Sequence, residues 1–127
     1  MKNTIELIHQ ITATKITFCY GAKAYSKYMQ KQFGLSEQIE RGAVTTIVEN
    51  SNTYRLVVGI KEFKDIYQLK ALIVHELSHT VSELMKRYGF VCDEFRSYTL
   101  QWLYQEIIPS LDAKLLKDSI KRDKKEK

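Results

Sequence analysis

The sequence His75-Glu76-Leu77-Ser78-His79 lies in the middle of a long stretch with helical periodicity, residues 66–88. Residues four apart on an α-helix project from the same side, one turn apart. His75 and His79 are therefore expected to face the same way. Glu76 follows the first histidine directly and projects from the adjoining side of the helix.

This spacing has a specific chemical meaning. Two imidazoles one helical turn apart can bind a single Zn²⁺ ion, and a carboxylate beside them can act as a general base. The H-E-x-x-H pattern therefore predicts a zinc-dependent hydrolase, with His75 and His79 as metal ligands and Glu76 as the base. The alternative interpretation is a pair of surface histidines on an amphipathic helix.

The helix that carries the motif has clear predicted ends. Asp65 is a predicted N-cap, Gln68 occupies the capping-box position, and Gly89 is a predicted C-terminal cap. Apolar residues lie on more than one side of this helix, which predicts a central position in the fold. We therefore expect the two imidazoles to be embedded in the core, where a metal would provide the partner that buried polar groups need. The apolar residues are Leu69, Leu72, Ile73, Leu77, Val81 and Leu84.

The other segments predict an α+β fold. We expect helices over residues 4–13, 22–33 and 94–108, and a last helix that begins at Ser110 after Pro109. Alternating or β-branched residues predict strands over 15–20, 44–48 and 54–60, the last two forming an antiparallel hairpin. The expected architecture is a small antiparallel or mixed sheet of about three strands, packed on the motif helix and on further C-terminal helices.

Length and charge indicate one domain, residues 1–116, followed by a basic tail, residues 117–127. The chain has 127 residues and a net charge of +5, of which the tail carries +3. The body is thus nearly balanced, and we do not expect it to bind nucleic acid. The sequence shows no apolar stretch for membrane insertion, no secretory signal and no paired-cysteine motif. These absences favour a cytoplasmic location without a membrane partner, and they leave the oligomeric state open.

A catalytic zinc site needs a third protein ligand. It must come from another segment, which argues against Glu83 on the same helix. Glu94 is the preferred candidate, because it opens a helix that can return antiparallel to the motif helix. Asp93, Cys92 and the isolated His9 are alternatives. Glu94 could equally be an ordinary acid at a helix N-terminus.

The motif together with Asp93-Glu94-Phe95-Arg96-Ser97-Tyr98 resembles the gluzincin group of zinc peptidases. More narrowly, the chain resembles small phage- and prophage-type proteins predicted to be metallopeptidases. The resemblance covers about residues 15–108 and implies a minimal zincin-like domain. It also implies ligand roles for His75, His79 and Glu94, a base role for Glu76, and a peptide substrate extended along a strand edge. The larger C-terminal subdomain of bigger gluzincins has no counterpart here.

Three hypotheses follow from the sequence. The first is a zinc metallopeptidase with a peptide or protein substrate, acting in the cytoplasm of its cell or, if phage-encoded, of the host. Its oxyanion donor would be Tyr98, Tyr88 or Arg96, with Tyr98 preferred. The second is a catalytically silent, zinc-binding zincin-like module that acts as a phage accessory or protein-interaction protein. The third is a small nucleic-acid-associated or phage accessory protein that acts through its basic tail.

Overall fold

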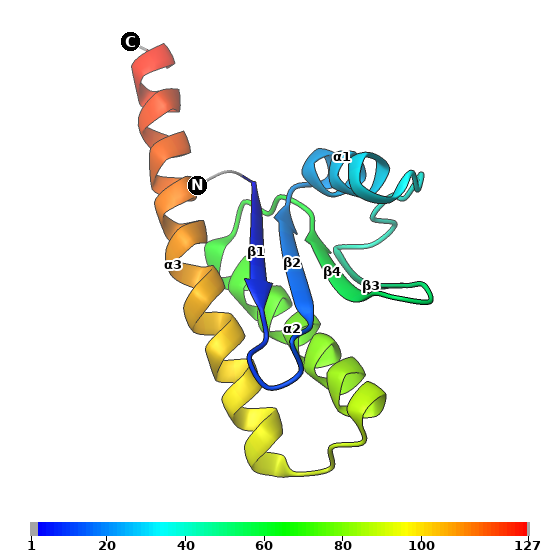
Figure 1. Cartoon of the computed structure of the whole chain (residues 1–127). Helices are drawn as coiled ribbons and strands as arrows, with labels where there is room; N and C mark the ends of the chain where they lie inside the picture. The colour runs from blue at the N-terminus through cyan, green and yellow to red at the C-terminus, as the bar shows by residue number, and fades with distance from the viewer. Residues whose placement is uncertain (1–2, 127) are drawn as a thin grey trace.

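The computed structural model describes the backbone of residues 3–126 and the side chains of residues 3–121. It is an α+β fold with a four-stranded mixed sheet and three helices (Figure 1). In chain order the elements are β1 (Thr4–Ile8), β2 (Lys15–Tyr20), α1 (Ala22–Phe33), β3 (Ala43–Glu49), β4 (Tyr54–Ile60), α2 (Ile66–Tyr88) and α3 (Asp93–Glu126).

The strands are arranged in the order β1-β2-β4-β3. Strand β2 pairs antiparallel with β1 and parallel with β4, and the β3–β4 hairpin is antiparallel. The predicted hairpin is thus confirmed, and its first strand, β3, forms one edge of the sheet.

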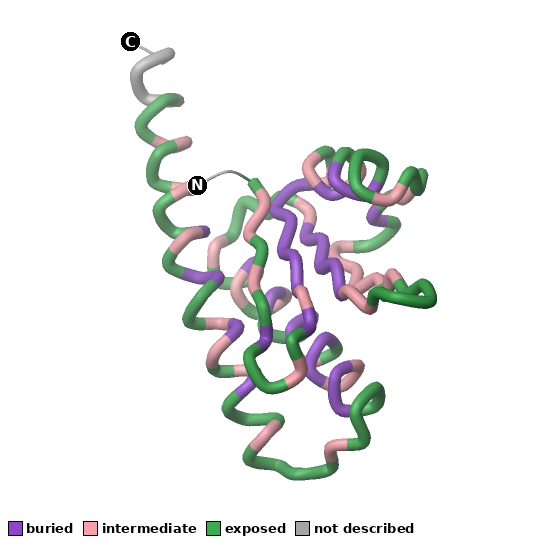
Figure 2. The backbone as a smooth tube through the Cα atoms, in the orientation of Figure 1, coloured by how far each residue is buried: buried purple, intermediate pink, exposed green. Residues whose placement is uncertain are grey.

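The helices cover both faces of the sheet (Figures 1 and 2). Helices α2 and α3 pack on one face, over apolar side chains that alternate along β2 and β4. Helix α1 packs on the other face, where Tyr25 and Met29 meet Cys19 and Val57. Because successive strand residues point to opposite faces, the two central strands can be buried on both sides, as Figure 2 shows.

Helix α2 begins and ends as its sequence predicts. The Asp65 carboxylate accepts hydrogen bonds from the backbone N–H groups of Tyr67 and Gln68, at 2.9 and 3.2 Å. At the other end Gly89 adopts a left-handed conformation, with φ of 72°. These caps fix the length of the helix and hence the position of its motif.

The helix predicted over residues 4–13 is wrong: this segment forms strand β1 and a turn. The apolar residues Ile5, Ile8 and Ile11 suggested a helical period, but Ile5 and Leu7 also fit a period of two. Both pack on the α2–α3 side of the sheet, whereas Ile8 is 61% exposed. Pairing with β2 decides between strand and helix. As a strand, residues 4–8 form backbone hydrogen bonds with the edge of β2, and a short helix there would leave that edge without partners.

The predicted helix break at Pro109 is also wrong, because α3 continues through Pro109 without a new cap at Ser110. Pro109 lies on the exposed side of the helix, whereas Ile107 and Leu111 are buried on either side of it. Packing of both flanks on the body therefore outweighs the lost backbone hydrogen bond and the ring clash. The expected boundary at residue 116 is not marked by a change in the helix.

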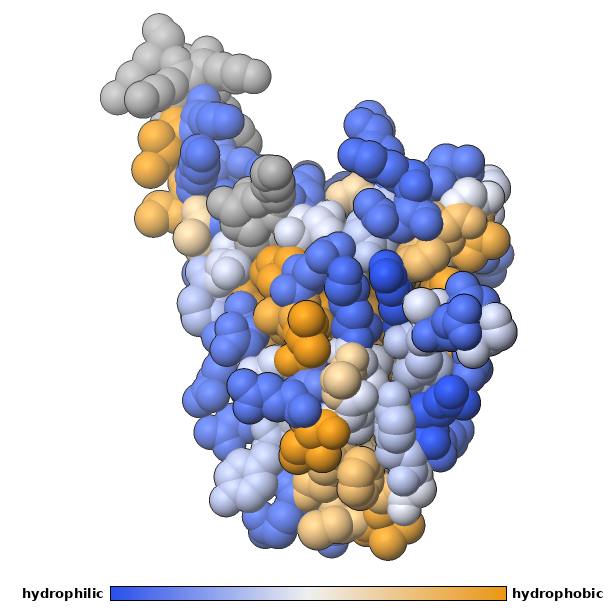
Figure 3. Space-filling model, viewed as in Figure 1, coloured by the Kyte–Doolittle hydropathy of each residue, from blue (hydrophilic) through white to orange (hydrophobic). Residues whose placement is uncertain are grey.

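Exposed apolar side chains gather along β1 and at the end of the molecule formed by the β1–β2 loop and the α2–α3 turn (Figure 3). Ile11 is 71% exposed and Val91 is 91% exposed.

Within residues 3–126, the helices contain no stretch that is long and apolar enough to cross a membrane.

Candidate metal centre

The two motif histidines meet at the surface of α2. Their Nε2 atoms lie 3.1 Å apart, and their rings are nearly perpendicular, with an interplanar angle of 83°. At this distance one imidazole can donate an N–H hydrogen bond to the other. Helical spacing therefore brings two nitrogen donors to one point, as the sequence predicts.

The expected burial of these imidazoles is wrong, since His75 and His79 are both exposed. Helix α2 buries one broad side, which includes Ile73, Leu77 and Val81, and the histidines project from the opposite flank. Water can therefore solvate them, and a metal is not needed to compensate for burial. Exposure also leaves the pair open to an ion and to a substrate.

The geometry of the pair fits one zinc ion. Zn–N bonds of about 2.0–2.1 Å at a tetrahedral angle place two ligand nitrogens about 3.3–3.4 Å apart. The observed separation of 3.1 Å is close to this value and requires only a small rotation of either ring. Two neutral imidazoles are also ordinary zinc ligands.

Glu76 points away from solvent toward the edge strand β3. Its side chain is 7% exposed, and its Oε1 atom accepts a 2.7 Å hydrogen bond from the Thr45 hydroxyl. The Thr80 hydroxyl donates to the backbone carbonyl of Glu76 at 3.1 Å and lies 3.3 Å from the Thr45 hydroxyl. Thr45 thus holds the carboxyl group where the helix meets the sheet, and Thr80 binds the backbone of Glu76 beside it.

Strand alternation brings Thr45 to this position. Thr46 points to the other face, where its hydroxyl bonds that of Tyr25 at 2.6 Å, so Thr45 must point toward α2. Thr45 and Thr80 are not among the site residues that the sequence predicts. Thr80 lies one turn after Glu76 and could have been found from that spacing, whereas Thr45 lies 31 residues away and carries no local signal.

The third predicted ligand, Glu94, is not gathered with the histidines in this structure. It is exposed in the first turn of α3. Among the residues that the structure describes, no three His, Cys, Asp or Glu side chains form a group that could hold a metal. Asp93 and Cys92 are exposed nearby in the chain, and the assignment of a third ligand stays a prediction.

His9, the remaining alternative ligand, is engaged elsewhere. Its ring is hydrogen-bonded to the Thr12 and Thr99 hydroxyls, at 2.8 and 3.4 Å, and packs edge-on against Phe95 and Trp102. Burial lowers the pKa of His9 below its ordinary value. His9 therefore has a structural role, because these contacts pack the β1–β2 loop against α3.

The three candidate oxyanion donors lie in different places. Tyr98, the preferred one, lines a small hollow with His9 and Trp102. The Tyr88 hydroxyl is hydrogen-bonded to that of Thr14 at 3.0 Å. The Arg96 guanidinium donates to the Ser82 hydroxyl at 3.3 Å, one turn beyond His79 on α2. Of the three candidates, Arg96 therefore contacts α2 nearest to His79. Tyr98 lies instead with His9 and Trp102.

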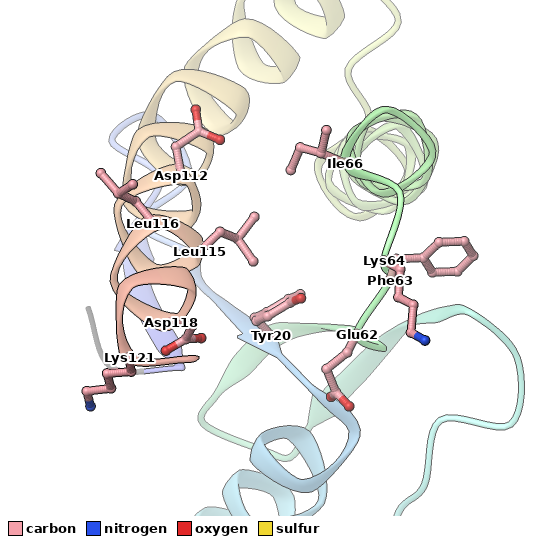
Figure 4. Close-up of a pocket in the computed structure, with 10 residues that line it drawn as sticks. All are labelled: Tyr20, Glu62, Phe63, Lys64, Ile66, Asp112, Leu115, Leu116, Asp118 and Lys121. Atoms are coloured by element: carbon pink, nitrogen blue, oxygen red, sulfur yellow. The ribbon is translucent and has the colours of Figure 1, made fainter. Parts of the chain in front are cut away.

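A larger hollow of about 1010 Å³ lies elsewhere, between the start of α2 and the C-terminal half of α3 (Figure 4). Side chains such as Tyr20, Ile66 and Leu115 line it, together with charged residues such as Asp112 and Lys121. The motif residues are not among those that line it. The hollow therefore offers no support for the predicted chemistry.

Comparison of the chain with protein-family profiles, with curated proteins and with solved structures finds no match.

Proposed function

We propose that the chain is a zinc-dependent peptidase whose centre is the His75–Glu76–His79 side of α2. The observation that carries this proposal is the exposed pair of Nε2 atoms at 3.1 Å, with a buried carboxyl group held beside it. Two surface histidines alone would have no need of an acid that is oriented by a second element of the fold. His75 and His79 would hold the zinc, and Glu94 is the candidate for the third ligand.

A bound zinc ion supplies Lewis acidity toward water and toward a carbonyl group. The Glu76 carboxylate would take a proton from water and return it to the departing amine. The Thr45 hydroxyl occupies Oε1 and fixes the direction of the carboxyl plane, which leaves Oε2 for the proton. An extended peptide would bind along the edge of β3, because β-strand addition gives backbone hydrogen bonds without sequence preference.

Zinc content tests the metal site. We expect zinc to copurify with the native chain, and to be lost from His75→Ala and reduced in Glu94→Ala. His9→Asn is the matched control, because it removes the third histidine of the chain without touching the pair. An absence of zinc in the native chain, or equal zinc in all variants, would remove the proposed site. Equal zinc in Glu94→Ala alone would reassign the third ligand.

Hydrolysis of a peptide library tests the base. We expect Glu76→Gln to keep its zinc and to lose about 10²–10⁴-fold in rate, the usual contribution of general acid–base catalysis. Glu83→Gln, on the same helix, is the matched control and should keep its activity. Unchanged hydrolysis by Glu76→Gln would show that the base is another group.

A second candidate function is a catalytically silent zinc-binding module. It differs from the first in that Glu94, which is not gathered with the histidine pair among the described residues, does not complete an open catalytic site. Zinc binding that depends on His75, combined with no hydrolysis by the native chain, would support this second function over the first.

A further inference from the structure

Among the residues that the structure describes, none pairs with the outer edge of strand β3, and the backbone groups along that edge can be assigned. The Lys61 N–H donates to the Gly42 carbonyl and the Asn50 N–H donates to the Thr53 carbonyl, both at 2.9 Å. These bonds lie at the two ends of the β3–β4 hairpin and fix which pairs are hydrogen-bonded, because such pairs alternate along an antiparallel ladder. The even-numbered residues of β3 therefore bond β4, and Ala43, Thr45, Ile47 and Glu49 direct their N–H and C=O groups outward.

This edge lacks the features that usually protect a sheet from pairing. Natural edges carry lysine, proline or a bulge, or they are kept short. Strand β3 has seven residues, Ala43–Glu49, with Glu49 as its one charged residue and no proline. Ile47 is 43% exposed. An edge of this kind is a template for pairing with another strand.

We propose that two copies of the chain pair through the outer edges of β3, with the two-fold axis at Thr46. Antiparallel pairing about this axis places Ala43 opposite Glu49 of the second copy, and Thr45 opposite Ile47. All four outward-facing residues then form hydrogen-bonded pairs, which gives about eight new backbone bonds. On the α1 face Val44 meets Val48 of the second copy, a β-branched pair that favours sheet formation.

Charge is also compatible with this register. The single carboxylate of each strand faces the small Ala43 of the other copy, so no two like charges stand directly opposite. Arg41 lies two residues before Ala43 and is exposed, so it comes diagonally opposite Glu49 of the second copy. Glu49 already forms an ion pair with Arg87 of its own chain, at 2.7 Å, so Arg41 of the second copy would add a second positive charge beside that pair, once at each end.

The pairing of two copies would also cover the side of α2 that carries His75 and His79. Helix α2 packs on both β3 and β4, and Glu76 contacts Thr45, next to the proposed axis. Strands about 4.8 Å apart would bring the α2 helices of the two copies to about 10 Å, an ordinary distance for packed helices. This consequence rests on the proposed peptidase function. The dimer occupies the edge of β3 where the peptide substrate would bind, so the activity of each chain would fall as the protein concentration rises.

Disulfide trapping tests the register. In a Cys92→Ser background, Thr46→Cys places two thiols across the axis, with Cα atoms about 4.5 Å apart, close enough for a disulfide. Val48→Cys is the matched control on the same face of the same strand, and its two copies would lie about 14 Å apart. We expect mild oxidation to crosslink Thr46→Cys at least about tenfold faster than Val48→Cys. Equal crosslinking of the two variants would overturn the register.

Sedimentation of the full native chain tests the association itself, with zinc and with a chelator. We expect a concentration-dependent dimer in both conditions, and a shift to monomer in Ile47→Pro, which removes an outward N–H but no bond to β4. A monomeric native chain at all concentrations, or a dimer unaffected by Ile47→Pro with its folding intact, would overturn the proposal. Zinc content and hydrolysis are measured separately, so failure of the pairing and failure of the peptidase function give different results.

Discussion

The Thr45 hydroxyl donates a 2.7 Å hydrogen bond to Oε1 of Glu76 and so joins the edge strand of the sheet to the motif helix. The Glu76 side chain is almost completely buried at this contact. A buried carboxyl group without such a donor would carry a large desolvation cost. The bond therefore serves the stability of the fold as well as the orientation of the proposed base.

Replacement of Thr45 by valine should lower the free energy of unfolding by about 1–3 kcal/mol, because it keeps the side-chain shape and leaves the carboxyl group without its donor. Urea unfolding of the purified chain measures this effect. Thr45→Ser is the control and should recover most of the loss, since it restores the hydroxyl. A valine variant as stable as the native chain would show that the hydrogen bond has no net value.

The elements with local signals could be predicted from the sequence, and the contacts between distant segments could not. Asp65 and Gly89 are caps whose side chain or conformational freedom acts within a few residues, so the limits of α2 follow directly. The choice between helix and strand for residues 4–8 depends on β2, which offers a free edge. The bond between Thr45 and Glu76 likewise depends on how the hairpin and the helix pack, and no local pattern records it.

Pro109 provides a test of how packing outweighs local preference. Proline in a helix interior costs about 3 kcal/mol, whereas its restriction of the unfolded chain returns about 0.4–1 kcal/mol. We therefore expect Pro109→Ala to stabilise the protein by about 2 kcal/mol. The measurement is the midpoint of denaturant unfolding, with Ser110→Ala as a control that should change stability by less than about 0.5 kcal/mol. An unchanged stability in Pro109→Ala would mean that α3 accommodates the proline without the expected cost in free energy.

The two cysteines should differ in reactivity. Burial raises the pKa of Cys19 to about 11, and its side chain is fully buried, whereas Cys92 is exposed. Because the thiolate is the reactive form, a thiol reagent should titrate one group in the native protein and a second only after unfolding. The Cys92→Ser variant should show no fast reaction at all. Rapid modification of Cys19 in that variant would indicate that β2 opens readily.

His9 should make the stability of the fold depend on pH. Burial lowers its pKa in the folded state, so below its unfolded pKa of about 6.5 the unfolded chain binds more protons than the folded one. The stability that neutral His9 contributes to the fold is therefore fully present above that pH. It is lost as the pH falls toward and through the pKa of His9 in the folded state. Unfolding free energies measured between about pH 8 and about pH 5 should decrease for the native chain. In His9→Gln, which keeps a polar side chain but cannot titrate, the decrease should be smaller. Identical slopes for the two proteins would show that protonation of His9 does not oppose the packing of the β1–β2 loop against α3.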